Sequence, residues 1–419
     1  MRTIVAESWL VVSGVLGLIG FASGSMTILL VGAMIFGAGG IARLWAAVAL
    51  DRVTYTRHLS ERRLYLGEEV SVTLGVKNAK IVPVPWIEVR ETVPRGMPAN
   101  VKTSMGGGPG TQYFERSTSL RSNDEIEWPF TMKAVRRGYF RVGPTLLRSG
   151  DLFGFFERDM ETGRPTDGII VYPHLYTLPE LGLPSARPFG ELRGTNRIFE
   201  DPSRVVGVRD YQPSDPLRRI DWYATARSQR MQSKVYEPSR SQALVVAVSI
   251  PTEEEVWRSP EPVLLERAVS IGASICRWGI EQKYAVGLVA NGSFPEAPRT
   301  IHVGAGNNPA QLNVLLEALA VVTPFTTVEM SRALEDPGNP LPPGATLVLV
   351  TALITERTQG TLLRLQARGH RVHVLKTSDR LWTRDLGSIQ VTEMAATMEV
   401  LEAAALAAGI APPVRVGDV

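Results

Sequence analysis

The feature that most constrains the fold is an amino-terminal run without a single ionisable side chain. It occupies residues 8–42, a length of 35 residues. One membrane crossing needs about 20 apolar residues, so this run is long for one span and suits two helices joined by a Ser-Gly-Ser turn. The sequence predicts a first helix at about 4–21 and a second at about 27–50. Glycines recur along both, which would let the two backbones approach closely.

The charges that flank this run predict its orientation. Arg2 precedes the first helix. Arg43 lies near the end of the second helix and Arg52 follows it, whereas the turn between the helices is uncharged. Basic residues favour the cytoplasmic side, so we expect a protein of the plasma (inner) membrane with both ends of the hairpin, and the bulk of the chain, in the cytoplasm. A cleaved signal peptide followed by one anchor would instead export the rest. The weakly basic start and the long second apolar run favour the hairpin.

Composition excludes some classes of partner. The 45 Lys and Arg residues nearly balance the 42 Asp and Glu residues, a net charge of +3, which gives no argument for nucleic acid. Cys276 is the single cysteine of the chain, so no intramolecular disulfide can form, and a reducing compartment is expected.

Three regions are expected after the membrane hairpin of residues 1–52: a β domain, a linker with a charged segment, and an α/β domain. Residues 53–172 contain short runs that alternate with period two, such as 69–76 and 86–93, and turn signals separate them. This pattern favours an antiparallel β-sandwich of immunoglobulin-like type. The aromatic run 151–156 is interpreted as the seam with the next domain, with an exposed partner-binding patch as the alternative.

Residues 173–242 form a proline-punctuated linker and a charged segment, and residues 243–419 form an α/β domain. Here buried strand patterns such as 243–250 and 346–351 alternate with amphipathic helix patterns such as 262–282. That order predicts a mainly parallel, Rossmann-like sheet with helices on both faces. The chain has no phosphate-binding loop and no nucleophile elbow, so no cofactor is expected.

The charged segment at residues 203–227, here called the hallmark segment, carries three aspartates and five arginines beside Leu217, Ile220 and Trp222. Unpaired charges are costly next to buried apolar groups, so a partly buried ionic network is predicted. Asp215 resembles a helix N-cap followed by proline, and Asp221 lies three residues after Arg218, within reach on a helix. The network is expected to brace two domains or to present a docking surface.

These residues resemble the hallmark of the bacterial family catalogued as "domain of unknown function fifty-eight". The matching positions are Arg209, Tyr211, Asp215, Arg218, Arg219, Ile220, Asp221, Trp222, Ala226 and Arg227. The resemblance implies a von Willebrand factor A-like α/β domain after the hallmark. It also implies partners, since family members are often encoded near MoxR-type AAA+ ATPases and transglutaminase-like membrane proteins.

The resemblance also raises a metal site. Domains of the von Willebrand A type hold a metal through D-x-S-x-S after their first strand, where this chain has Ser249-Ile250-Pro251-Thr252-Glu253, without the leading aspartate. We therefore expect a non-enzymatic, membrane-anchored adaptor or assembly factor in which Asp215, Arg218, Asp221, Trp222 and Arg227 hold or present the hallmark. Two alternatives stay open: an enzyme that uses the hallmark carboxylates, and a divalent-metal module with ligands rearranged around Thr252.

Overall fold

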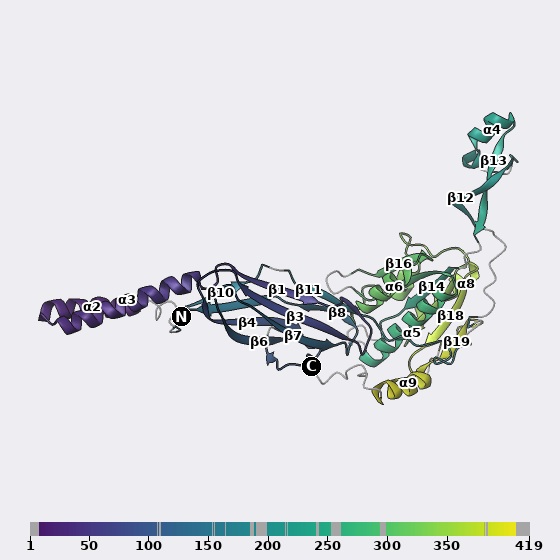
Figure 1. Cartoon of the computed structure of the whole chain (residues 1–419). Helices are drawn as coiled ribbons and strands as arrows, with labels where there is room; N and C mark the ends of the chain where they lie inside the picture. Colours follow the sequence, from purple (N-terminus) through teal and green to yellow (C-terminus); the bar gives the residue numbers. More distant parts are fainter. Residues whose placement is uncertain are drawn as a thin grey trace. The chain divides into compact units, whose positions relative to one another are not determined.

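The computed structural model separates into two compact units, one ending at Tyr172 and one beginning at Pro173 (Figure 1). It describes residues 8–106, 108, 110–152, 154, 156–163, 165–184, 188–189, 199–213, 215, 217–239, 243–252, 261–293, 299–380, 382 and 384–407. Arg2, Glu253 and Ser214 lie outside the described residues, as does the start of the first predicted membrane helix. Each unit is described by itself.

The first unit begins with two apolar helices, α2 (Ser8–Ser23) and α3 (Met26–Ala49). Of the described residues, only α3 forms a helix long and apolar enough to cross a bilayer. The 16 residues of α2 fall short of the roughly 20 that a crossing needs. The structure therefore supports one membrane span rather than the two that the sequence predicted.

Some of the glycines bring α2 and α3 together as expected. A Cβ atom on Gly20 would lie 2.8 Å from the backbone nitrogen of Leu29, and one on Gly39 would lie 2.2 Å from the ring of Trp9. A Cβ on Gly37, in contrast, would meet nothing within 4 Å. The contacts pair the end of α2 with the start of α3, so the two helices run antiparallel.

The rest of the first unit consists of β-strands in three sheets, with orders β1-β3-β7, β10-β9-β4-β6-β5 and β2-β11-β8. Neighbouring strands pair antiparallel except β2 and β11. The sheets pack face to face, with the rings of Phe114 and Phe130 stacked 4.8 Å apart in the core. The strands are β1 (Val53–Leu59), β2 (Arg63–Leu64), β3 (Glu69–Asn78), β4 (Val84–Pro94), β5 (Ser104–Met105), β6 (Thr111–Leu120), β7 (Glu125–Lys133), β8 (Gly138–Val142), β9 (Thr145–Gly150), β10 (Glu157–Glu161) and β11 (Asp167–Val171).

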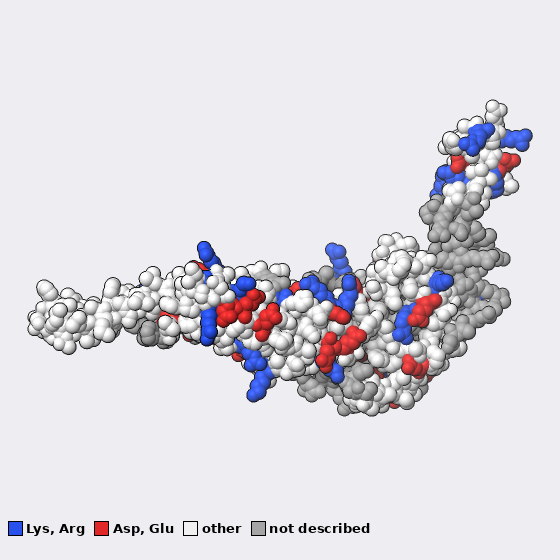
Figure 2. Space-filling view, in the orientation of Figure 1, with Lys and Arg blue, Asp and Glu red and all other residues white. Residues whose placement is uncertain are grey.

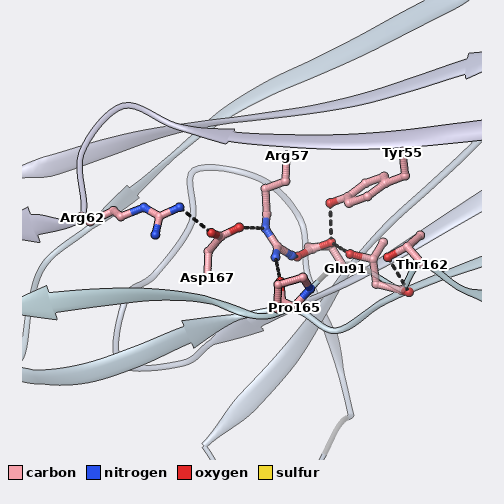
Figure 3. Close-up of polar contacts among 8 residues, drawn as sticks. Tyr55, Arg57, Arg62, Glu91, Thr162, Pro165 and Asp167 are labelled. Carbon is pink, nitrogen blue, oxygen red and sulfur yellow. Dashed lines mark hydrogen bonds and ion pairs between the residues drawn. The ribbon is translucent and has the colours of Figure 1, made fainter.

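An ion network crosses the interior of this β domain (Figure 3). Arg57 donates to Glu91 over 2.6 Å and to Asp167 over 2.8 Å. The hydroxyl group of Tyr55 donates to Glu91 over 2.7 Å, and burial raises the pKa of that hydroxyl. Because each buried charge has an opposite partner, the network ties β1, β4 and the start of β11 together.

The second unit contains a six-stranded sheet of order β16-β15-β14-β17-β18-β19. Its strands are β14 (Ala243–Val248), β15 (Ala285–Ala290), β16 (Ile301–Gly306), β17 (Thr346–Thr351), β18 (Arg371–Lys376) and β19 (Gln390–Glu393). All neighbours are parallel except β16, which runs antiparallel to β15. The sheet is therefore mixed.

Helices cover both faces of this sheet. On one face, a Cβ on Gly272 or Gly279 of α5 would touch Val248, Val246 and Leu244 of β14. On the other face, α7 and α8 share a core cluster with the alternate β14 residues Val245 and Ala247. The helices are α5 (Pro262–Glu281), α6 (Gln311–Ala320), α7 (Met330–Leu334), α8 (Glu356–Ala367) and α9 (Ala395–Ala407).

The aromatic run 151–156 does not lie where the sequence placed it. Phe156 packs edge-on against Trp9 of α2, with ring centroids 6.3 Å apart, so the run meets the apolar helix α2 within the first unit. Its Phe153 and Phe155 lie outside the described residues. The interpretation of the run as a seam with the next domain is therefore wrong in the part that the structure describes.

Candidate functional site

The hallmark segment lies on a two-stranded hairpin that belongs to the second unit. Strand β12 (Phe199–Asp210) pairs antiparallel with β13 (Gln232–Ser239), and α4 (Trp222–Ser228) lies between them at the hairpin's end (Figure 1). Residues 211–231, which join the two strands, are here called the hallmark tip. The tip is fastened to the strands by a bridge between Ile220 and Ser233, and Ile220 is its buried apolar residue.

Asp215 holds the first turn of the tip. Its carboxylate accepts from Arg209 over 2.7 Å and from the backbone N–H of Gln212 over 3.0 Å, and only 7% of its side chain is exposed. The hydrogen bond from Arg209, followed by the one from Gln212, lowers the pKa of Asp215. The hydroxyl group of Tyr211 donates to the backbone oxygen of Asp215 over 3.2 Å. Arg209, Tyr211 and Asp215 thus form one closed structural unit.

Asp221 has a different role from the predicted pairing with Arg218. Its side chain caps the amino end of α4, accepting from the backbone N–H groups of Tyr223 and Ala224 at 3.0 Å each. Asp215 does not cap a helix as predicted, because a short 3₁₀ turn (Leu217–Arg219) follows it and α4 begins only after Asp221. A seven-residue helix has too few intrahelical bonds to form without such a cap.

Three large side chains of the tip are exposed to solvent. Trp222 is 70% exposed, Tyr223 is 76% exposed and Leu217 is 70% exposed. The prediction that Trp222 and Leu217 pack beside a buried network is therefore wrong. Arg227 instead pairs with Tyr223, lying 5.1 Å from the ring centroid and donating to the hydroxyl over 3.0 Å.

The tip therefore combines a rigid frame with an exposed surface. The frame consists of the aspartates and their backbone partners, and the surface consists of Leu217, Trp222 and Tyr223 with exposed arginines around them (Figure 2). Tyr223 was not singled out in the sequence. Its exposure could have been inferred from its position next to Trp222, because a helix this short cannot bury both of its faces.

The segment 249–253, at the position where von Willebrand A domains hold a metal, begins at the carboxyl end of β14. Ser249 and Thr252 are both buried. The hydroxyl of Thr252 accepts from the backbone N–H of Glu261 over 2.6 Å, and its carbonyl accepts from the guanidinium of Arg380 over 3.3 Å. In the described part of the chain, no group of three or more His, Cys, Asp or Glu residues could hold a metal. Among the described residues, the guanidinium of Arg380 occupies the Thr252 carbonyl oxygen, and a cationic neighbour disfavours a divalent cation there.

A shallow hollow of about 1010 Å³ lies beside α7 and α8 and is lined by carboxylates and arginines. Arg364 donates to Glu335 over 2.8 Å, and this hydrogen bond lowers the pKa of Glu335. Arg357 pairs with Glu329 over 3.2 Å. A general acid needs a raised pKa, so the lowered pKa of Glu335 favours a structural role for this carboxylate.

Comparison with known proteins supports the family. The model of the family described as "Protein of unknown function DUF58" matches residues 207–403, which include most of the hallmark and the six-stranded unit. "Uncharacterized protein YeaD" of Bacillus subtilis (strain 168) is 24% identical over 328 residues, covering 75% of this chain and 74% of that protein. These matches confirm the resemblance carried by the hallmark residues.

Two solved structures overlap a smaller part of the chain. The CARDB domain of a Pyrococcus furiosus protein is 18% identical, with a TM-score of 0.20, covering 28% of this chain and 86% of that domain. The sporulation control protein Spo0M of Bacillus subtilis is 19% identical, with a TM-score of 0.18, covering 29% of this chain and 50% of that protein. With TM-scores this low, neither likeness carries an argument about function.

Proposed function

We propose, from its membership of the DUF58 family, that this chain is a membrane-anchored adaptor or assembly factor that binds a partner protein through the hallmark tip. The observation that carries the proposal is the exposure of Trp222 and Tyr223 on a frame held by Asp215 and Asp221. Exposed aromatic side chains bordered by arginine have the composition of the residues that dominate binding energy in protein interfaces.

The membrane part of the proposal rests on α3. This helix is 24 residues long and uncharged up to Arg43, enough to span the hydrocarbon core. Arg43 and Arg52 follow the apolar stretch, so the basic flank favours the cytoplasmic side of the plasma (inner) membrane for the β domain.

The partner proposed from the family is a MoxR-type AAA+ ATPase, with a transglutaminase-like membrane protein as a further component. The six-stranded unit would serve as a von Willebrand A-like scaffold, with Arg380 beside Thr252 where such domains hold a metal. The β domain would be an immunoglobulin-like spacer between that scaffold and the bilayer. A rigid, folded spacer suits a protein that brings components together rather than one that transforms a small molecule.

The rival function is an enzyme that uses the hallmark carboxylates. A general acid needs a raised pKa in a site open to substrate. The pKa of Asp215 is instead lowered by Arg209, and both oxygens of its carboxylate already accept hydrogen bonds. One carboxylate oxygen of Asp221, Oδ1, accepts from two amide groups of α4. These contacts favour the adaptor.

Co-purification from detergent-solubilised native membranes tests the adaptor. The chain would be compared with a Trp222→Ala, Tyr223→Ala double variant and with Phe325→Ala, which removes an aromatic ring that is 71% exposed elsewhere on the second unit. The partner is expected with wild type and with Phe325→Ala. The double variant should lose it, because an interface aromatic contributes about 2 kcal/mol or more, roughly 30-fold in affinity. Equal recovery by all three proteins would contradict the proposal.

A further inference from the structure

The end of the β domain where α3 enters presents two exposed apolar side chains on neighbouring loops. Ile81, between β3 and β4, is 83% exposed, and Leu152, between β9 and β10, is 62% exposed. The β3–β4 loop lies at this end because Asn78, the last residue of β3, pairs with Val53, just after the end of α3. The β9–β10 loop lies there too, because Ser149 near the end of β9 pairs with Ile87 near the start of β4. We call residues 79–83 and the described residues 151, 152, 154 and 156 the membrane-proximal loops.

No flexible linker separates α3 from the β domain. Lys80 donates to the carbonyl oxygens of Val48 over 2.8 Å and of Asp51 over 3.0 Å, and also to that of Ala49. Leu50 is buried in the core cluster of the sheets. Cations that satisfy the last carbonyl groups of a helix fix its end. The depth of α3 in a bilayer therefore fixes the depth of the membrane-proximal loops.

The length of α3 gives that depth. Twenty residues at about 1.5 Å each span the roughly 30 Å of a hydrocarbon core. Counted from Met26, the first residue of α3, the twentieth residue is Trp45. Trp is enriched at the boundary between hydrocarbon and water. The guanidinium of Arg158, which pairs with Asp51 over 3.1 Å, lies on the water side of this boundary.

Phe156, at the end of the second loop, lies deeper than Trp45. The ring of Trp9 packs 5.9 Å from that of Phe36 and covers Gly39, so this part of α2 is level with residues 36–39 of α3. Phe156 packs on the same Trp9 ring. Six residues of helix separate position 39 from position 45, which is about 9 Å. A bilayer that covers the length of α3 therefore also reaches Phe156.

The loop is built to hold this position. Asp151 is fully buried and accepts from the backbone N–H of Phe156 over 2.6 Å, while its carbonyl accepts from the indole of Trp86 over 3.0 Å. This closed loop leaves Leu152 pointing to the surface rather than into the sheet. An exposed leucine on a fixed loop would be poorly placed in water and well placed among acyl chains.

We propose that the β domain rests on lipid in a defined orientation, with the loop that carries Leu152 inserted into the bilayer surface and the loop that carries Ile81 at the level of the headgroups. The occupant of this surface is the lipid interface, because the surface is continuous with α3. The inference rests on the proposed membrane anchoring by α3. It adds a second attachment that tethering by a helix alone would not require.

Site-directed labelling of the full chain in nanodiscs of phosphatidylcholine and phosphatidylglycerol tests the inference. Leu152→Cys and Ile81→Cys would carry an environment-sensitive fluorophore. Met105→Cys is the matched control, since Met105 is 89% exposed and pairs with Gln112 near the far end of the β4–β6 ladder. Val84 and Pro94 at the two ends of that ladder are about 33 Å apart. Cys276 is fully buried, so the unsubstituted chain should take no label.

Quenching by lipids that carry a doxyl group on the acyl chain is expected at position 152, more weakly at position 81 and not at position 105, with emission at shorter wavelength at the first two. Equal emission and no quenching at all three positions would overturn the inference. Carbonate extraction of the same chain distinguishes failure of the membrane anchor from failure of the loop insertion. An extractable chain contradicts the anchor itself, whereas a chain that stays in the membrane with unquenched labels contradicts only the loops. Shielding of the labels in native membranes but not in nanodiscs would show that a protein covers the surface, which also overturns the inference.

Discussion

Arg57 and Glu91 form an ion pair of 2.6 Å with 1% and 0% of their side chains exposed. Arg57 also reaches Asp167, which in turn binds Arg62 at the surface over 2.7 Å. The same aspartate therefore has one buried and one exposed arginine partner (Figure 3). Substituting Arg57 or Arg62 therefore compares a buried with an exposed arginine–carboxylate pair.

We expect Arg57→Ala to destabilise the β domain by about 3–5 kcal/mol, because it leaves Glu91 buried without its cation. Arg62→Ala removes a guanidinium that is 68% exposed and should cost less than about 1 kcal/mol. Hydrogen exchange of the amide groups of β1 and β4 in the detergent-solubilised full chain measures both values. Similar losses for the two variants would show that burial does not determine the strength of this network.

Asp221 offers a second matched comparison. Asp221→Ala removes the acceptor for two backbone N–H groups of α4 and should destabilise this helix by about 1 kcal/mol. Asp221→Ser keeps an acceptor at the cap and should retain most of the stability. Hydrogen exchange of residues 222–228 reports the difference. If alanine and serine exchange at the same rate, the cap does not hold α4.

The periodic parts of this fold could be predicted from the sequence, because burial imposes a repeat on side chains. The apolar run at 346–351 is strand β17 (Thr346–Thr351), and the helical spacing at 262–282 is α5 (Pro262–Glu281). Strand β19 (Gln390–Glu393) shows no such repeat of buried side chains. That short strand is specified by pairing with β18 rather than by its own pattern.

The hallmark tip shows why its geometry could not be predicted. The pairing of Asp215 with an arginine was expected from the cost of a buried charge, and the structure provides Arg209. Leu217 and Trp222 were assigned to the interior because apolar residues usually are. Among the described residues, no second layer covers this tip of one short helix on two strands, and sequence spacing carries no information about such a layer.

The α2–α3 contact depends on particular glycines. Gly39→Leu would push a side chain into the ring of Trp9, which lies 2.2 Å from an added Cβ, whereas Gly37→Leu enters open space. Overpacking of this kind typically costs about 1–3 kcal/mol, so only Gly39→Leu should separate the helices. Limited proteolysis of α2 in detergent, compared between the two variants, measures this. Cleavage of both variants at the wild-type rate would contradict the close packing.

The Asp215–Arg209 pair predicts how the tip responds to acid. Arg209 holds the pKa of Asp215 below its ordinary value, which is about 3.9 in an unfolded chain. Because the folded pKa is the lower one, the stabilisation is fully present above about pH 3.9 and is lost as the pH falls through the lowered value. Hydrogen exchange of residues 209–216, corrected for the intrinsic rate, should therefore stay constant from pH 7 to about pH 4 and rise below it. Asp215→Asn cannot ionise and should show faster exchange throughout, without this dependence on pH. A loss of protection in wild type near neutral pH would point to a different titrating group.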